Sequence, residues 1–342
     1  MKTTGKRVAK TEPTGKMKKW KKAVLALLLV LLVGVGGVYG VANHFLGQIS
    51  RAENGQEEVI PPDQETFGDT SEETTDEGSN QPAPEIDRVQ PIDCSDLINI
   101  MLVGQDRREG QGRQRSDAMI LCSINPSTGQ VALISFMRDL YVSLPGGYSN
   151  NRMNAAYAFG GFKLLDATLL ENFGISVDAN IEVDFTGFEA IINKLGGIDV
   201  DLSAAEAKYM GSGYQAGRNH LDGAQALEFA RIRKLDSDFN RTGRQREVLM
   251  AVFQKIKSRS LPQLLDTAQA VLPYLTTDMS NGEMIQLATK LFPVLSSGDI
   301  QSHRIPADGT YRSASVRGMS VLVPDLNANW TKLKDDYLPL SR

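Results

Sequence analysis

The chain has 342 residues, 41% of them hydrophobic, which is enough for one large or two small domains with a buried core and excludes a peptide-scale binder. Its formal net charge of -4 is sorted along the chain: residues 1–22 carry 9 basic and 1 acidic residue, and residues 51–91 carry 12 acidic and 2 basic residues. Taking these from the totals of 37 and 41 leaves 26 basic and 28 acidic residues, so the remainder is nearly neutral.

The N-terminal part predicts a membrane anchor. Residues 23–43 carry no charge and have about the 20 residues that a helix needs to cross a bilayer. The basic residues 1–22 before them predict a cytoplasmic N-terminus, and hence a single-pass protein of the cell membrane with an extracellular C-terminal domain. A cleaved signal peptide is the alternative, although the apolar run exceeds the roughly 7–15 residues of a signal core.

Residues 44–91 are rich in Glu, Asp, Thr, Ser and Pro and poor in aliphatic residues, which predicts a disordered acidic linker. One domain over residues 92–342 follows.

The two cysteines of this domain, Cys94 and Cys122, could oxidise to one another outside the cell. Cys122 lies in the apolar run MILCSI, however, where a buried free thiol is equally consistent. The three histidines are far apart in the sequence, which argues against a His-based metal site or triad.

Short apolar runs bounded by turn residues predict strands that are buried on both faces. The first three runs are residues 97–104, 118–124 and 131–136. Apolar residues at helical spacing then predict a helix over residues 154–173, interrupted at Gly160 and Gly161 and closed by Gly174.

After this helix, strands and helices alternate. The further predicted strands are residues 181–185, residues 198–202 and segments near Ile305 and Val321. The further predicted helices are residues 188–195, 222–227, 241–257, 261–274, 281–291 and 327–337. The fold class predicted is therefore α/β, with a central mixed β-sheet flanked by helices in a single domain.

Aspartates and arginines stand beside the ends of the first three strands. Asp106 follows the first strand, and Arg115 and Asp117 precede the second, so antiparallel pairing would gather all three at one end. Arg138 and Asp139 leave the third strand at the same end only if the intervening pairing brings them back, which the sequence does not decide.

A second group follows residue 230. Arg231 and Arg233 would point to one face on a strand and would diverge on a helix. Arg241 and Gln245 share a face near the start of a predicted helix, where free N–H groups attract phosphate, and Arg244 is expected to add charge nearby.

Guanidinium groups grip phosphate oxygens through paired hydrogen bonds, and the chain after residue 91 holds 17 Arg against 9 Lys. These residues predict a site for a pyrophosphate and a divalent metal. A surface of exposed salt bridges is the alternative interpretation.

At these residues the chain resembles the LytR-CpsA-Psr family, membrane-anchored enzymes of Gram-positive cell walls. The resemblance covers most of residues 96–260, through LINIMLVGQD, RSDAMILCSINP, SFMRDLYVSLPG, MNAAYAFGG, EVDFTGFEAIINKLGGIDVDL, LDGAQALEFARIRK and DFNRTGRQREVL. Met137 stands where the family usually has proline, and Asn240 where it usually has glycine, so loop geometry rather than charge is expected to differ.

The resemblance implies a Mg2+-dependent phosphotransferase. Such an enzyme takes a glycopolymer, for example teichoic acid or capsule, from a polyprenyl pyrophosphate donor, releases polyprenyl phosphate, and joins the polymer to peptidoglycan through a phosphodiester. By position, the implied catalytic residues are Asp106, Asp117, Arg115 and Arg138, with Asp106 and Asp117 as metal ligands. The implied pyrophosphate-binding residues are Arg108, Arg231, Arg233, Arg241 and Gln245.

Several points stay open at this level. Either aspartate could take the proton of the acceptor hydroxyl, expected to be the 6-hydroxyl of N-acetylmuramic acid. The polyprenyl chain needs an apolar groove, for which Phe159, Phe162, Leu165 and Phe188 are candidates, with ordinary core packing as the alternative.

Two other functions would use similar residues. One is a non-catalytic module that binds anionic wall polymer or lipid carrier, and the other is a polyprenyl pyrophosphatase. No nucleic-acid partner is expected.

Overall fold

The computed structural model describes residues 43–44, 46–52, 59–64, 86, 88–105, 113–291, 294 and 299–341. The chain divides into two compact units, Met1–Leu46 and Gly47–Arg342, and the second contains the sheet and helices that follow. Apart from Asn43, the predicted membrane helix at residues 23–43 lies outside the described residues, as does the basic segment 1–22. Within the described part of the chain, no helix has the length and apolar composition needed to span a membrane.

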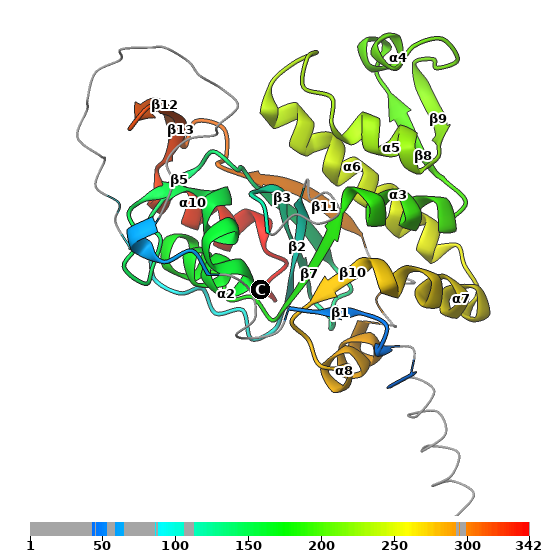
Figure 1. Cartoon of the computed structure of the whole chain (residues 1–342), viewed down its shortest axis with the longest axis horizontal. Coiled ribbons are helices and arrows are strands. Elements are labelled where there is room, and N and C mark those ends of the chain that lie inside the picture. The colour runs from blue at the N-terminus through cyan, green and yellow to red at the C-terminus, as the bar shows by residue number, and fades with distance from the viewer. Residues whose placement is uncertain are drawn as a thin grey trace, which may run out of the picture. The chain divides into compact units, whose positions relative to one another are not determined.

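A seven-stranded mixed sheet in the order β1-β10-β7-β2-β3-β4-β11 forms the centre of the unit (Figure 1). Its strands are β1 (Ser50–Arg51), β2 (Ile98–Gln105), β3 (Ser116–Ile124), β4 (Val131–Phe136), β7 (Ala179–Asp184), β10 (Leu275–Thr277) and β11 (Ile300–Ile305). β3 pairs antiparallel with both β2 and β4, whereas β7 is parallel to β2 and β11 is parallel to β4. The C-terminal ends of β2, β4, β7 and β11 and the N-terminal end of β3 therefore meet at one edge of the sheet, called the polar edge below.

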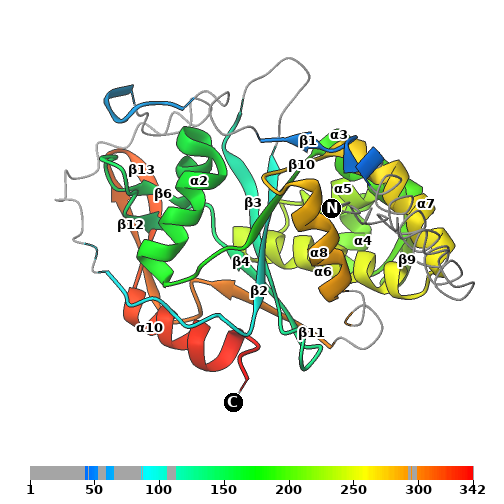
Figure 2. The same cartoon turned by 90° about the horizontal axis from the view of Figure 1, so that it is seen from below.

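Helices cover both faces of this sheet (Figure 2). One face carries α2 (Met153–Phe173) and α10 (Leu326–Lys332), which continues into a π-helical turn at Leu333–Tyr337. The other carries α3 (Phe185–Lys194), α5 (Gly223–Ala230) and α6 (Asp238–Lys257). The remaining helices are α4 (Ala204–Met210), α7 (Leu261–Val271) and α8 (Asn281–Leu291).

Three two-stranded sheets lie outside the central one. They pair β5 (Tyr141–Val142) with β6 (Asn151–Arg152), β8 (Ile198–Leu202) with β9 (Gly217–Leu221), and β12 (Tyr311–Val316) with β13 (Met319–Pro324).

The two faces of the central sheet are packed differently. Alternate residues such as Met101 and Leu121 are fully buried in the core cluster that includes α2. Their neighbours Leu102 and Ile120 point the other way, because side chains alternate along a strand, and they line a cavity beneath α3, α5 and α6. The helices over that cavity share a separate apolar cluster with β8 and β9.

The predicted fold class is confirmed for the mixed α/β domain. The predicted strand 131–136 coincides with β4, and the predicted interruption of α2 is present, since Gly160 and Gly161 have non-helical backbone angles. Gly174 ends α2 in the left-handed conformation (φ 70°), which a glycine adopts without a Cβ penalty.

Two predicted elements differ from the structure. Residues 198–202 form a strand, but β8 pairs with β9 in a separate two-stranded sheet rather than continuing the central sheet. Its burial alternates, with Asp199 and Asp201 exposed, which suits a strand that is buried on one face only. The strand considered for Arg231 and Arg233 is also absent, because α5 continues through Ala230 and Arg231 caps it.

The predicted linker at residues 44–91 contacts the domain in at least two places. Ser50–Arg51 form edge strand β1, paired with β10, and Ile49 is buried. The Ile60 backbone N–H donates to the Phe159 carbonyl at 2.9 Å. A start of the folded domain at residue 92 is therefore too late, because these two isoleucines supply the apolar burial that the acidic sequence around them lacks. Residues 53–58, 65–85 and 87 lie outside the described residues.

Cys94 and Cys122 are both buried free thiols. Burial raises the pKa of Cys122 to about 12, so this thiol stays protonated and unreactive at neutral pH.

A buried carboxyl cluster makes stability depend on pH. Asp166 on α2 accepts a hydrogen bond from the Asn180 side chain at 2.9 Å, and that side chain also donates to Asp278 at 2.7 Å. Burial, opposed by the Asn180 hydrogen bond and reinforced by the Asp278 charge, raises the pKa of Asp166 to about 7. The folded protein therefore holds this proton more tightly than the unfolded chain does between about pH 4 and 7.

The stability that Asp166 contributes is fully present below its unfolded pKa and is lost as the pH rises towards 7. We predict that Asp166→Asn, which keeps the acceptor for Asn180, removes this component. Thermal melts at half-unit pH steps should show the variant gaining stability relative to the wild type from pH 4 to 7. Parallel curves for the two proteins over that range would contradict the prediction.

Candidate functional site

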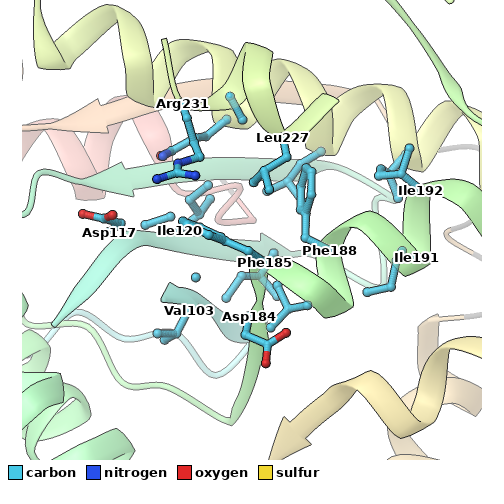
Figure 3. Close-up of a pocket in the computed structure, with 18 of the residues that line it drawn as sticks. Val103, Asp117, Ile120, Asp184, Phe185, Phe188, Ile191, Ile192, Leu227 and Arg231 are labelled. Carbon is cyan, nitrogen blue, oxygen red and sulfur yellow. The ribbon is translucent and has the colours of Figure 1, made fainter. Parts of the chain in front are cut away.

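A pocket of about 390 Å³ opens between the sheet and helices α3, α5 and α6 (Figure 3). It is called the apolar pocket here, because most of its lining is aliphatic or aromatic. Asp117 and Arg231 lie at one end and Ile191 and Ile192 at the other (Figure 3). The pocket is therefore amphipathic along its length, with charged groups beside the polar edge of the sheet.

Asp117 links two arginines from distant segments. Its Oδ1 atom accepts from Arg138 Nη1 at 3.3 Å and from Arg233 Nη2 at 3.2 Å. Arg138 follows β4, and the two antiparallel pairings bring the C-terminal end of β4 back beside the start of β3. This pairing resolves the question that the sequence left open for Arg138.

Arg241 is the most deeply placed cation of the site. Its side chain is 2% exposed, and its Nη2 atom lies 2.7 Å from Asp238 Oδ1, one turn earlier on α6. Its Nε and Nη1 atoms have no hydrogen-bond partner among the described residues. Burial lowers the pKa of Arg241, Asp238 opposes this shift, and the charges of Arg138 and Arg233 add to it.

A buried guanidinium with unused N–H groups is costly unless an anion completes it. Gln245, four residues after Arg241 on the same helix, lines the same pocket, as their spacing predicted. Its Oε1 atom likewise has no hydrogen-bond partner in the described part of the chain.

Arg231 and Arg233 also line the pocket, although neither lies on a strand. The Arg231 guanidinium lies over the ring of Phe185, 4.3 Å from its centroid, and so joins the charged end of the pocket to the apolar part. Arg244, expected to add charge here, instead pairs with Glu206 at 2.6 Å and with Asp236 on the other side of α6. That expectation was wrong, because the carboxylates of Glu206 and Asp236 hold the Arg244 guanidinium away from the apolar pocket.

Two further carboxylates lie beside Arg138: Asp139, which the sequence placed at this edge only on condition of the strand pairing, and Asp238, which was not among the predicted site residues. Arg138 Nε lies 3.6 Å from Asp139 Oδ2 and 3.9 Å from Asp238 Oδ2. Arg152 Nη1 lies 3.5 Å from Asp139 Oδ1. Burial, partly offset by the Arg138 charge, raises the pKa of Asp139. Its place next to Arg138 in the sequence was the available signal.

Three predicted site residues remain, Arg115, Asp106 and Arg108, and the structure describes the first of them. Arg115 directly precedes β3, two residues from Asp117 at the polar edge. Asp106 and Arg108 lie outside the described residues.

The four candidates for a lipid groove separate in the structure. Phe188 lines the apolar pocket, but Phe159, Phe162 and Leu165 are buried in the α2 core and face away from it. The pocket wall comes instead from the sheet and α6, where Leu249, Val252 and Ile256 continue the face of Arg241 and Gln245. This three- and four-residue spacing was visible in the sequence as a helical stripe.

The donor chemistry of the site is compatible with a hard divalent cation, which prefers carboxylate and phosphate oxygens. Both ion pairs of Asp117 fall on Oδ1, so Oδ2 is not used by them. Within the described residues, no group of three or more His, Cys, Asp or Glu side chains is arranged to hold a metal ion.

A family model described as the LytR_cpsA_psr family matches residues 64–335. The protein named polyisoprenyl-teichoic acid–peptidoglycan teichoic acid transferase TagU, from Bacillus mycoides strain KBAB4, is 34% identical over 222 residues, or 64% of this chain and 71% of TagU. Regulatory protein MsrR of Staphylococcus aureus strain Mu50 is 29% identical over 250 residues, or 72% of this chain and 76% of MsrR.

Solved structures give the same family of folds. Bacillus subtilis TagT matches with a TM-score of 0.57 at 28% identity, covering 74% of this chain and 95% of TagT. A structure titled TagT bound to LIIa-WTA matches with a TM-score of 0.59 at 29% identity, covering 73% of this chain and 92% of that chain.

We predict that Arg241→Gln weakens the binding of inorganic pyrophosphate about 10- to 100-fold, since a charged hydrogen bond is worth roughly 1.5–3 kcal/mol. The unfolding temperature should fall little or rise, because the substitution removes a buried charge. Calorimetric titration and thermal melts measure the two effects. Arg312→Gln on exposed β12 is the matched control, and equal affinities for both variants would contradict the assignment.

Proposed function

The chain belongs to the LytR-CpsA-Psr family, and we propose that it is a phosphotransferase that joins a polyprenyl-pyrophosphate-linked glycopolymer to peptidoglycan through a phosphodiester. Transferase names among its relatives, such as TagU, support the reaction class. The names of these relatives also make teichoic acid the first polymer to test, with capsule as a further candidate.

The observation that carries the proposal is the single pocket that is apolar along one part and lined by arginines at the other end. A polyprenyl pyrophosphate has the same division, with a hydrocarbon chain next to a diphosphate. Burial of the chain among residues such as Phe188 and Leu249 would place the diphosphate beside Arg231, Arg233 and Arg241. An ordinary salt-bridged surface would not explain why these guanidiniums line an apolar cavity.

In the proposed reaction, the acceptor hydroxyl oxygen attacks the phosphorus that bears the glycan. A new P–O bond forms, the bond to the bridging diphosphate oxygen breaks, and polyprenyl phosphate leaves with that oxygen. The arginines stabilise the charge that develops on the phosphoryl oxygens and on the leaving group. The acceptor proton passes to a carboxylate, for which Asp117 is the described candidate and Asp106 the other.

We also propose a role for Mg2+, held by Asp117 and Asp106 together with phosphate oxygens. When bound, the ion would neutralise charge on the diphosphate. Asp117 has a further function that needs no metal, because it holds Arg138 and Arg233 in place for the substrate.

We also propose that a helix at residues 23–43 anchors the protein and that the domain lies outside the cell, next to a membrane-embedded donor. The donor and the peptidoglycan acceptor are then the two substrates.

We predict that the purified domain, given a lipid-linked saccharide pyrophosphate, Mg2+ and peptidoglycan oligomers, forms a phosphodiester conjugate detectable by mass spectrometry. Arg138→Ala should lower the rate by at least about 100-fold, the usual size of effect when a group that stabilises transition-state charge is lost. Carrier cleavage without conjugate would indicate a pyrophosphatase. Donor binding without turnover would indicate a regulatory binding module.

A second prediction tests the hydrocarbon part of the pocket. Leu249→Trp should fill the cavity and weaken donors with long polyprenyl chains more than donors with a short chain, because only the former need the deeper volume. Leu170→Trp, at an exposed position of α2, is the matched control. Equal losses for long and short donors would show that the chain binds elsewhere.

A further inference from the structure

A second pocket, of about 680 Å³, lies on the opposite side of α6 from the apolar pocket. It is called the α6–β11 pocket here. Its walls come from α6, β11, the end of the π-helical turn after α10, and the start of α4 with its N-cap. Unlike the apolar pocket, it is lined mainly by charged and polar side chains.

The pocket is lined by a buried cation, Arg246, for which the described part of the chain supplies no counter-charge. Arg246 is 8% exposed and donates from Nε to Ser302 Oγ and from Nη1 to Ser135 Oγ, both at 2.7 Å. Within the described residues, no carboxylate lies within ion-pair distance of it. Arg244, two residues earlier, shows the contrast, since it is equally buried and pairs with Glu206 and Asp236.

A second arginine adds positive charge beside Arg246. The Arg304 guanidinium lies over the ring of Phe239, 4.4 Å from its centroid, and its ion pair among the described residues is with Asp308, whose side chain is 91% exposed. An exposed partner compensates a charge weakly. Burial, together with the charge of Arg304, lowers the pKa of Arg246 to about 10, as expected for two cations that lack a shared anion.

The other groups of the pocket restrict the class of anion. Carboxylates of Glu206, Asp236, Glu247 and Asp308 line the same pocket, the first two paired with Arg244 and the last with Arg304. They would repel a polymer that carries a phosphate on every repeat, but they can accept hydrogen bonds from hydroxyl, amide or ammonium groups. His303 and Tyr337 stack with ring centroids 4.1 Å apart and supply an aromatic surface at the same site. A ligand with one carboxylate and several hydrogen-bond donors would pair best with both the arginines and the carboxylates of this pocket.

We propose that the α6–β11 pocket binds a carboxylate-bearing glycopeptide through Arg246 and Arg304, and that it holds the peptidoglycan acceptor while the donor occupies the apolar pocket. The second half of this inference rests on the proposed function. The two pockets are separated by α6, about 10 Å across, so one sugar chain could reach from one to the other around the helix N-terminus. Arg246 also donates to Ser135 on β4, three residues before Arg138.

The test measures binding without any donor. The probe is a soluble disaccharide peptide of N-acetylglucosamine and N-acetylmuramic acid with free carboxylates, titrated against the domain by calorimetry. Amidation of its carboxylates, Arg304→Gln, and Arg246→Lys should each weaken binding at least about fivefold, whereas Arg312→Gln on exposed β12 should not. Arg304→Gln keeps the test valid if the buried Arg246 variant fails to fold.

A competition experiment tests whether the glycopeptide binds outside the apolar pocket. Saturating inorganic pyrophosphate, which is expected at the arginines of the apolar pocket, should leave glycopeptide binding in place. The inference is overturned if pyrophosphate displaces the glycopeptide, if the amidated probe binds equally well, or if poly(glycerol phosphate) competes more strongly than the glycopeptide. Donor cleavage by the wild-type protein is assayed separately, so failure of the proposed reaction would not be confused with failure of this binding site.

Discussion

A guanidinium can be buried only where an anion or a dense set of acceptors compensates it, and this requirement governs the polar edge of the sheet. Asp117 compensates the charges of Arg138 and Arg233 through one carboxylate oxygen. Asp238 compensates Arg241, whose remaining N–H groups have no acceptor among the described residues. Among the described residues, Arg241 therefore keeps N–H donors that the carboxylates of this edge do not use, which supports the proposed diphosphate site.

The arrangement depends on strand direction. Two successive antiparallel pairings return the chain to the same edge, so Asp117 at the start of β3 and Arg138 after β4 become neighbours. The parallel strand β7 ends at the same edge and leads directly into α3, which forms part of the roof over the apolar pocket. The polar and apolar halves of one pocket are thus built by the same few chain reversals.

Helix α6 has a different role on each side. The face with Arg241 and Gln245 continues into an aliphatic stripe, which forms a wall of the apolar pocket. The face with Arg244 and Arg246 lines the α6–β11 pocket. Because one rigid helix separates the two sites, a change in its position would alter both pockets together, and its N-terminal turn lies where the proposed donor and acceptor would meet.

The sequence alone was enough to predict those elements that depend on residues close together in the chain. Runs of apolar residues predicted the central strands, glycine predicted the kink and the end of α2, and four-residue spacing placed Arg241 and Gln245 on one face of a helix. The charged residues of the candidate site were also recognisable, because the motifs that carry the family resemblance contain them. The sheet order and the convergence of Asp117 with Arg138 and Arg233 were decided only by tertiary structure, since pairing partners are set by contacts between distant segments. Burial was decided in the same way: Phe159 and Leu249 are both apolar helix residues, yet only packing determines that the first lies in the core and the second lines the pocket.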